Sequence, residues 1–381
     1  MGDTLELSER TLAETVAAQG GRLYRVGGCV RDALRGLPAK DIDFCVTGMV
    51  KKNFKELFPE AKECGKSFPV FLLTVDGVKC EVAFARTERK VGPGYLGFKV
   101  SSKPKVTIEE DLFRRDTTIN SMAMDCLSGA IIDPYGGRED IERGILRATS
   151  EHFSEDPIRA LRLAGQAARL GFTVEPRTLA LAATVAEELK DEPVERMLAE
   201  LTKALSEAAE PARFFRVLDE AHLLPVTFGE LAALGRGERE RALQLLDATA
   251  TQTSSLKVRF ASFGLTLPQE ELEKWNKRMT LPGDWLEGAI TVGQLAKLLA
   301  QPDAETIVTA LIRLGRGAIE AADFDCIAKA GALSIPELAG LKAVMQQAVR
   351  AEVLPPQLRG REIGVWLRER QVKAIACALE A

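Results

Sequence analysis

Two aspartates two positions apart, Asp41 and Asp43, are the side chains in this sequence best suited to holding a metal ion. The surrounding residues 41–46 favour a β-strand, on which alternation projects both carboxylates from one face and Ile42 and Phe44 from the other. Paired carboxylates suit Mg²⁺, a hard ion that fills its other coordination positions with water and phosphate oxygens. A bound metal pair lowers the pKa of an attacking hydroxyl and neutralises a leaving pyrophosphate. We therefore expect Asp41 and Asp43 to be metal ligands and catalytic residues.

A glycine pair precedes these aspartates. The β-prone run at residues 22–26 ends in a turn at Gly27 and Gly28, and a helix-compatible segment follows. Glycine lets the backbone approach an anion closely, and N–H groups at a helix start point toward it. We expect a triphosphate here, bound by Gly28 and by the charge of Arg31. A glycine turn or an aspartate pair alone is usually structural, but one strand–turn–helix–strand unit with both indicates phosphate chemistry.

The run GGCVRDALRGLPAKDIDF at residues 27–44 resembles the signature of class II tRNA nucleotidyltransferases, the family of CCA-adding enzymes and bacterial poly(A) polymerases. The resemblance implies an α+β protein. Its N-terminal head would be similar to that of DNA polymerase β, with a mixed sheet and helices, and an all-α neck, body and tail would follow. It also implies Mg²⁺ as cofactor, and CTP, ATP and the tRNA 3′ end as partners.

A second motif, RRDTTINSMA, lies at residues 114–123. By itself the acidic, then amphipathic segment 109–122 predicts a loop leading into a helix with acidic residues at its start. The motif is similar to one in which an arginine grips the triphosphate while Asp and Asn organise the sugar pocket. The resemblance implies these roles for Arg115, Asp116 and Asn120.

A third motif, EDPIRALRLA, lies at residues 155–164. Alone it predicts a capped helix with Asp156 at the N-cap, Pro157 at the first helical position and Arg159 in a local ion pair. It is similar to the family's nucleotide-selecting motif. Cytosine and adenine each present an amino donor beside a ring-nitrogen acceptor, whereas uracil and guanine reverse that pattern. Asp156 can accept from the amino group and Arg159 can donate to the ring nitrogen, so side chains would replace a template strand.

The same helix departs from the family pattern further on. Arg162 is present and is expected to bind the nucleotide. Gly165 and Gln166 stand where the family usually has a basic residue and an aromatic residue. A weaker grip on the triphosphate or a shifted nucleotide preference would follow.

A hairpin is predicted at residues 68–75 and 78–85 around the turn Asp76–Gly77, and its second strand, which carries Glu81, could pair near the aspartate strand. Glu81 is a possible third metal-binding carboxylate, and the alternative is an ordinary edge-strand charge. The segment 86–95 is charged and glycine-rich, which predicts a mobile loop. A loop at this place in the family takes part in adding the terminal A, and the alternative is an ordinary solvated hairpin loop. The loop residues singled out are Arg86, Arg89 and Lys90.

Composition narrows the class of protein. With 381 residues and 46% hydrophobic content, the chain can bury a sizeable core. Its seven cysteines include no CxxC pair, so we expect neither a zinc site nor a disulfide framework, and a reducing cytoplasm fits best. No run is apolar and long enough to span a membrane. The net charge of −4 argues mildly against a nucleic-acid binder unless basic side chains gather on one surface.

The helical half carries weaker signals. Residues 257–265 read KVRFASFGL, similar to the lead-in to the His–Asp phosphohydrolase signature of long family members, but Ser262 and Phe263 stand where His–Asp would be. With two histidines in the chain, no such phosphohydrolase is expected. The end of the chain, LRGREIGVWLRER at 358–370, resembles the family's closing helical segment. Its basic residues would contact tRNA phosphates or form a solvated helix face, namely Arg359, Arg361 and Arg368.

These observations predict four parts, which are a head (1–147), a neck with the nucleotide-selecting helix (148–208), a body (209–283) and a tRNA-binding tail (284–381). The functional hypothesis is a template-independent enzyme that adds CCA, or its terminal part, to tRNA, acting as a monomer or dimer. An A-adding enzyme and a bacterial poly(A) polymerase stay open as alternatives. A non-catalytic tRNA-binding paralogue is the alternative of another class.

Overall fold

The computed structural model describes residues 7–39, 41–65, 69–92, 94, 97–351 and 353–380. The chain divides into two compact units, each described here by itself. Unit 1 comprises Met1–Glu192 and Glu220–Leu223, and unit 2 comprises Pro193–Asp219 and Leu224–Ala381. The four-part division stays a prediction.

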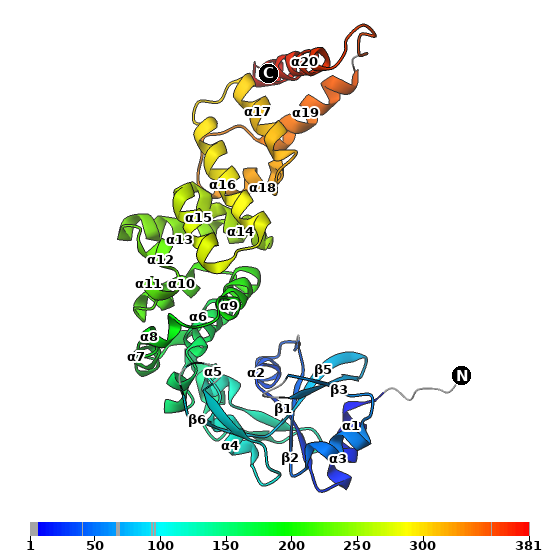
Figure 1. Ribbon diagram of the computed structural model, residues 1–381, viewed down its shortest axis with the longest axis vertical. Helices are drawn as coiled ribbons and strands as arrows, with labels where there is room; N and C mark the ends of the chain where they lie inside the picture. Colours follow the sequence, from blue (N-terminus) through cyan, green and yellow to red (C-terminus); the bar gives the residue numbers. More distant parts are fainter. Residues whose placement is uncertain are drawn as a thin grey trace, which may run out of the picture. The chain divides into compact units, whose positions relative to one another are not determined.

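Unit 1 contains the strands and the first helices (Figure 1). Its strands are β1 (Arg22–Val26), β2 (Asp43–Thr47), β3 (Lys62–Cys64), β4 (Val70–Val75), β5 (Val78–Phe84), β6 (Thr87–Lys90), β7 (Phe98–Ser101), β8 (Ala123–Asp125), β9 (Ile131–Ile132), β10 (Ile145–Leu146) and β11 (Thr173–Val174). Its helices are α1 (Glu9–Ala18), α2 (Gly28–Leu34), α3 (Lys51–Leu57), α4 (Ile108–Phe113), α5 (Gly137–Arg143), α6 (Ile158–Leu170), α7 (Pro176–Ala183), α8 (Ala186–Leu189) and the 3-10 helices η1 (Thr118–Asn120) and η2 (Glu151–Glu155).

Among the described residues, seven strands form the main sheet in the order β3-β4-β5-β2-β1-β8-β9. β2 is parallel to β5, and the other neighbouring pairs are antiparallel. The predicted hairpin is confirmed as β4 and β5, joined by Asp76 and Gly77 with φ of 48° and 75°. Positive φ at both turn positions matches the twist of a tight hairpin. The mixed sheet and the helices that follow it confirm the predicted α+β class.

Helices cover both faces of this sheet. On one face, Leu12 of α1 and Phe54 of α3 belong to a buried cluster with Phe44, Phe71 and Val82 of the sheet. On the other face, α4 packs through Ile108 and Leu112 in a second cluster. Alternation along β2 and β5 explains this division, because successive side chains point to opposite faces. The polar residues at the ends of these strands therefore lie at the edge of a sheet that is held by packed helices on both faces.

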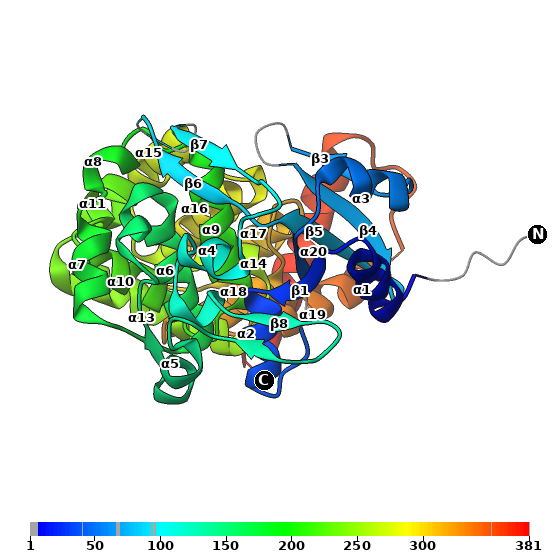
Figure 2. The same ribbon diagram turned by 90° about the horizontal axis from the view of Figure 1, so that it is seen from below.

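The structure corrects one predicted strand boundary and one predicted loop. The sequence predicts a strand over residues 41–46, but β2 begins at Asp43, where its pairing with β5 begins. It also predicts a loop over 86–95, and that prediction is wrong for Thr87–Lys90, which forms β6. This strand pairs with β7 in a hairpin of its own, visible in Figure 2. A narrow two-stranded ribbon keeps charged side chains near solvent or ion partners on both faces, so low hydrophobicity does not exclude a strand.

Other predicted segments are shifted or partly outside the described residues. The sequence predicts a loop into a helix over 109–122, but the helix α4 comes first. Thr107 and Glu110 form a capping box that begins it, and the RRDTTINSMA motif follows. The sequence also predicts a helix over residues 1–20, and α1 is the helix described there. Residues 1–6 of that prediction, Phe68 of the hairpin, and Pro93 and Tyr95 of the loop lie outside the described residues.

Unit 2 is helical in its described residues (Figure 1). Its helices are α9 (Val194–Glu207), α10 (Ala212–Glu220), α11 (Leu224–Thr227), α12 (Gly229–Ala232), α13 (Arg236–Gln252), α14 (Leu256–Ala261), the 3-10 helix η3 (Ser262–Leu265), α15 (Gln269–Met279), α16 (Gly283–Leu298), α17 (Ala304–Leu314), α18 (Ala321–Ala330), α19 (Leu338–Ala351) and α20 (Arg361–Glu380). Fully buried aromatic rings, including Phe215, Phe260 and Trp275, pack in its core. Within the described residues, no helix has the length and apolar character needed to cross a membrane.

Candidate active site

The two predicted metal ligands lie at the beginning of β2. The parallel register of β2 and β5 places Asp43 directly beside Glu81, and both side chains are exposed. Asp41 precedes the strand and is also exposed. Its negative charge acts on Asp43. The sheet register therefore brings together Asp43 and Glu81, which come from two separate segments. Asp41 lies before β2, so the strand alternation predicted for Asp41 and Asp43 does not position it.

The electrostatic environment of Asp43 favours a cation. Neighbouring protein atoms remove part of the hydration of this surface carboxyl group, and the charges of Glu81 and Asp41 also raise its pKa. The positive charges of Arg115 and Arg162 oppose the shift. A divalent cation would relieve the repulsion, so the donor set fits a hard ion such as Mg²⁺. In the described part of the chain, no three His, Cys, Asp or Glu side chains form a metal-binding group, so Glu81 as a third ligand stays a prediction.

The glycine pair brings the backbone close to two arginines. Gly27 has a φ of 76°, which favours glycine. A Cβ atom at Gly27 would lie 3.2 Å from Nη1 of Arg115. One at Gly28, the first residue of α2, would lie 3.4 Å from Nη2 of Arg31. Two guanidinium groups beside a glycine backbone are a combination that can bind phosphate oxygens.

Arg31 is held in place by two partners. Its Nε and Nη2 atoms donate to the Asp32 carboxylate at 2.9 and 3.0 Å. Its Nη1 donates at 2.8 Å to Oδ1 of Asn120, which lies in η1. Asn120 in turn donates from Nδ2 to Oδ1 of Asp116 at 3.1 Å. Hydrogen bonds therefore join the first and second motifs, although Arg31 and Asn120 are 89 residues apart in sequence.

Asp116 connects these motifs to the nucleotide-selecting helix α6. Arg162 of α6 donates from Nε to Oδ2 of Asp116 at 2.9 Å, and its Nη2 lies 2.8 Å from the same oxygen. The Thr117 backbone N–H donates to Oδ1 at 2.8 Å. Burial alone would raise the pKa of Asp116, but the Arg162 charge and these hydrogen bonds hold it well below its ordinary range. Asp116 is thus a buried carboxylate that stays ionised and orients its neighbours.

Arg115 is oriented by Asp111, a residue that was not predicted from the sequence. Asp111, with 1% of its surface exposed, accepts from Nε and Nη2 of Arg115 at 3.2 and 3.0 Å. It also accepts from Nη2 of Arg114 at 2.7 Å and from the Arg86 backbone N–H at 3.1 Å. Burial alone would raise the pKa of Asp111, but the two arginine charges lower it to about 2. The spacing of Asp111 from Arg114 and Arg115, three and four residues on a helix, was a signal for this cluster.

The selector helix differs in detail from the prediction. The sequence predicts Asp156 at the N-cap and Pro157 at the first helical position, and both assignments are wrong by one residue. Pro157 is the N-cap and α6 begins at Ile158, so Asp156 lies one residue before the N-cap. The Asp156 carbonyl accepts from the Arg159 backbone N–H at 3.0 Å. Arg159 is 7% exposed, and its Nη1 donates to the His152 carbonyl. Burial lowers the Arg159 pKa, and the charge of Asp156 opposes that shift. The two predicted selecting residues therefore influence each other electrostatically.

The predicted loop residues lie at the base and along β6. Arg86 donates from Nε to Oε1 of Glu88 at 2.9 Å. Lys90 contacts both carboxylate oxygens of Glu188 in α8 at 2.7 Å. The same carboxylate accepts from the Gly94 backbone N–H at 3.3 Å. Arg89 is an exposed residue of this strand. The turn end of the β6–β7 hairpin is thus bound to α8 through Lys90 and Gly94.

Glu88 carries the hairpin's contact with the selector region. Its Oε1 accepts from Nη1 of Arg114 at 2.9 Å. Its Oε2 lies 3.9 Å from Nη2 of Arg159. Glu88 was not predicted as a site residue, because a charged residue in a segment predicted as a loop gives no signal for these contacts.

The three predicted RNA-binding arginines of unit 2 are in different environments. Arg359 and Arg361 are exposed, and Arg359 donates from Nη1 to the Leu358 carbonyl at 2.8 Å. Arg368 donates from Nη2 to Oε2 of Glu305 at 2.8 Å and to Oγ1 of Thr309 at 2.6 Å. These residues do not form one cluster through the hydrogen bonds observed.

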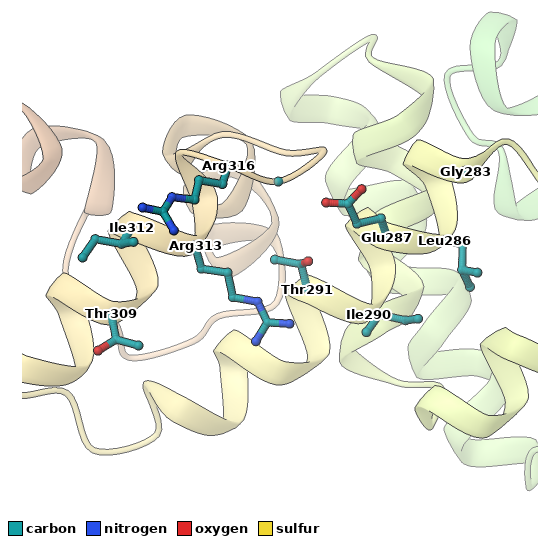
Figure 3. Close-up of a pocket in the computed structure, with 10 residues that line it drawn as sticks. Gly283, Leu286, Glu287, Ile290, Thr291, Thr309, Ile312, Arg313 and Arg316 are labelled. Carbon is teal, nitrogen blue, oxygen red and sulfur yellow. The ribbon is translucent and has the colours of Figure 1, made fainter. Parts of the chain in front are cut away.

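Unit 2 also has a groove of about 680 Å³ that the sequence did not indicate. It lies along α16, α17 and the residues after α17, and Figure 3 shows Glu287, Arg313 and Arg316 beside its apolar side chains. Arg313 donates to the side chain of Gln294. Arginines beside a groove can contact a phosphate backbone without reading its sequence.

Two family models match this chain. The Poly A polymerase head domain matches residues 23–147. The model described as the probable RNA and SrmB-binding site of polymerase A matches residues 171–234. The first of these matches includes the glycine turn, the aspartate pair and the Arg115 motif.

Relatives and solved structures agree with these matches. The chain is 44% identical over 253 residues to the Multifunctional CCA protein of Nitrosococcus oceani, covering 63% of this chain and 61% of that one. It is 35% identical over 380 residues to the CCA-adding enzyme of Pseudomonas putida strain W619, covering 93% of this chain and 97% of the relative. The crystal structure of the Bacillus stearothermophilus CCA-adding enzyme in complex with CTP matches with a TM-score of 0.70 and 25% identity, covering 97% of this chain and 91% of that chain.

Proposed function

The chain belongs to the family of CCA-adding enzymes, and from this premise we propose that it is a template-independent tRNA nucleotidyltransferase. It adds CCA, or the terminal part of CCA, to the 3′ end of tRNA from CTP and ATP. The observation that carries the proposal is the hydrogen bonding that joins the three motifs. Arg31 of the first motif donates to Asn120 of the second, and Asn120 donates to Asp116. Arg162 of the selector helix donates to the same Asp116. Side chains from three motifs that are distant in sequence are therefore held in one network.

In the proposed reaction, the 3′-hydroxyl of the tRNA attacks the α-phosphorus of the bound nucleotide. A P–O bond to the tRNA forms, the bond between the α-phosphorus and the bridging oxygen breaks, and pyrophosphate leaves. Asp41 and Asp43 would hold Mg²⁺, which supplies charge neutralisation and a lowered hydroxyl pKa when bound. Arg31 and Arg115, which lie beside the glycine turn, bind phosphate oxygens, and this orients the α-phosphate for attack.

Base selection is assigned to the start of the selector helix. Asp156 accepts from the exocyclic amino group of cytosine or adenine, and Arg159 donates to the adjacent ring nitrogen. UTP and GTP would leave these groups without hydrogen-bond partners. Such a mismatch rejects the wrong nucleotide far more strongly than a difference in size does. The burial of Arg159 supports this role, because a partly dehydrated guanidinium distinguishes more strongly between a paired and an unpaired base.

We propose that the protein acts in a reducing cytoplasm. We also propose that it has no phosphohydrolase activity of the His–Asp type. All seven cysteines lie in the described part of the chain, and they are free thiols. Ser262 and Phe263, at the place of the His–Asp pair, are buried residues of η3. Buried serine and phenylalanine side chains offer no metal ligands of the kind that this hydrolase needs.

The proposal is tested with three tRNAs that end before C74, after C74 and after C75. Each is incubated with the protein, Mg²⁺ and labelled CTP or ATP, singly and together. The expected result is extension of all three to the mature CCA end, with no incorporation from UTP or GTP. Incorporation of A only after C75 would indicate an A-adding enzyme, and long A tracts on unrelated RNA would indicate a poly(A) polymerase.

The absence of incorporation on all three tRNAs would overturn the proposed activity. Retained tRNA binding in that case would support the non-catalytic paralogue. The matched control is the Asp43→Asn protein, which keeps the size of the side chain and removes its charge.

A further inference from the structure

Gln166 stands in helix α6 where the family resemblance would place an aromatic residue, and both ends of its amide are used. It is 2% exposed. Its Nε2 donates to Oδ2 of Asp116 at 3.1 Å, and its Oε1 accepts from Oγ1 of Thr117 at 2.7 Å. An ionised carboxylate can only accept hydrogen bonds, so the amide nitrogen must face Asp116. The side chain is therefore fixed in one orientation.

Gln166 shares an acceptor atom with Arg162. Both donate to Oδ2 of Asp116, Arg162 at 2.9 Å and Gln166 at 3.1 Å. Oδ1 of Asp116 is occupied by donors from Thr117 and Asn120. The two donors on Oδ2 differ in exposure, because the Arg162 side chain is 46% exposed and Gln166 is buried.

This difference matters for a nucleotide that binds Arg162. The Arg162 side chain binds Asp116 in the structure, so a phosphate bound at its exposed part would compete with Asp116 for the same guanidinium group. A move away from Asp116 leaves a buried carboxylate oxygen with one donor fewer, which is costly if no other donor remains. A phenylalanine at position 166 could not supply that donor.

We propose that Gln166 is a positioning residue that keeps Asp116 hydrogen-bonded while Arg162 turns to the nucleotide. The inference rests on the proposed function and on the expectation from the sequence motif that Arg162 binds the nucleotide. It gives Gln166 a function in the place where the family usually has an aromatic residue. Gln166 and Thr117 hold Asp116 from the buried side, and Arg162 binds the same carboxylate from its more exposed side.

The test is a double-mutant cycle of Gln166→Leu and Arg162→Ala, measured as KM and kcat for CTP on a tRNA that ends before C74. Leucine keeps the approximate volume of glutamine and removes both hydrogen bonds. We expect Gln166→Leu to raise KM about tenfold with kcat nearly unchanged, because Asp116 then binds Arg162 more tightly; the size follows from losing one hydrogen bond to a charged group. In the Arg162→Ala background, Gln166→Leu should cause little further rise in KM.

Two controls separate this role from a loss of stability. Leu12→Ala removes a fully buried side chain of the same unit in α1, and it should lower the melting temperature without raising KM. Gln166→Glu places a second carboxylate against Asp116 and should raise KM when it folds, more so at high pH. An equal KM increase in both Arg162 backgrounds would overturn the inference. So would an unchanged KM for Gln166→Leu.

The outcome can be distinguished from failure of the proposed function. If the wild-type protein incorporated no nucleotide, the proposed function would fail, and the CTP-induced rise in melting temperature would still test Gln166. A smaller rise for Gln166→Leu than for Leu12→Ala would support the inference. An equal rise in both variants, or no rise with the wild-type protein, would overturn it.

Discussion

The arginines of unit 1 and those of the C-terminal helices of unit 2 are held in different ways. Arg115 and Arg162 are bound to Asp111 and Asp116, carboxylates that are 1% and 4% exposed. Arg368, by contrast, pairs with Glu305, whose side chain is 61% exposed. A buried pair fixes geometry at a cost in desolvation, whereas an exposed pair is screened by salt and easily exchanged.

This difference matches what each region is proposed to do. Selecting a base requires groups held in place to a fraction of an ångström, so the charges of unit 1 are tied into buried networks. Contacting an RNA backbone requires positive charge without fixed geometry. We therefore expect variants in unit 1 to change chemistry and stability, and variants in the tail to change only salt-dependent affinity.

The largest effect is expected at the metal-binding carboxylates. Asp43→Asn should reduce nucleotide incorporation by at least about a thousandfold, because charge stabilisation by a bound metal is worth several kcal/mol. The dissociation constant for tRNA should change little, since Asp43 does not contribute positive charge. Rates are measured in single turnover with saturating tRNA. Glu63→Gln, at an exposed position of β3 in the same sheet, is the control, and more than a tenth of the wild-type rate in Asp43→Asn would contradict the metal assignment.

A large loss of stability is expected from the buried cluster around Asp111. Asp111→Ala leaves Arg114 and Arg115 without their shared carboxylate, and this should lower the free energy of unfolding by roughly 3 kcal/mol. Glu305→Ala removes the exposed pair with Arg368 and should cost less than about 1 kcal/mol. Urea denaturation of the two variants compares the regions directly. Similar losses in both would break the distinction between buried and exposed arginines.

The pH dependence of stability should report the same carboxylate. The pKa of Asp111 is lowered from 3.8 to about 2 in the folded chain, so its ionised form is favoured by folding. Its contribution, about 2 kcal/mol, is present above the ordinary pKa and is lost as the pH falls from about 4 to 2. The difference in unfolding free energy between wild type and Asp111→Asn should therefore shrink over that range. A difference that stays constant down to pH 2 would contradict the shifted pKa.

A smaller effect is expected at the β6–β7 hairpin. Glu188→Gln weakens the half-buried pair with Lys90, worth about 1 kcal/mol, which corresponds to roughly a fivefold change. If the hairpin takes part in adding the terminal A, incorporation of A should fall by about that factor while incorporation of C falls less. Glu187→Gln is a neighbouring control, because Glu187 pairs with Lys190 and not with the hairpin. Equal losses for A and C would argue against a role specific to A.

The head was the more predictable region because its signals are local. The glycine turn and the hairpin around Asp76 follow from short patterns of turn residues and alternating hydrophobicity. The same holds for the proposed chemistry, since Asp41 and Arg115 were predicted as site residues from local motifs. Apart from this hairpin, the sequence did not establish which strands are neighbours or which distant side chains contact each other.

Three examples show that limit. Glu81 lies beside Asp43 because β2 and β5 are parallel, a register that no local pattern specifies. Glu88 contacts Arg114 from a segment whose charges suggested a loop. Gln166 was recognised as a departure from the family pattern, but its contact with Asp116 spans 50 positions in sequence. Buried polar networks are specified by long-range geometry, so sequence patterns indicate their members without indicating their partners.

The smallest effect, and the one that most sharpens the comparison, is expected within the tail. Arg361 is exposed, whereas Arg368 already binds Glu305 and Thr309 and would have to leave them to reach RNA. Arg361→Ala should therefore weaken tRNA binding by a factor of about three and reduce the salt dependence of log Kd by roughly one counterion. Arg368→Ala should do less on both measures, because losing the RNA contact is partly offset by losing the competing Glu305 pair. Binding is measured from 50 to 200 mM salt with the nucleotide absent, and Glu362→Gln controls for a charge change at the neighbouring position. A larger effect of Arg368→Ala would mean that ion pairs in the tail position arginines for RNA as those of unit 1 do for nucleotides, and the contrast between the two regions would no longer hold.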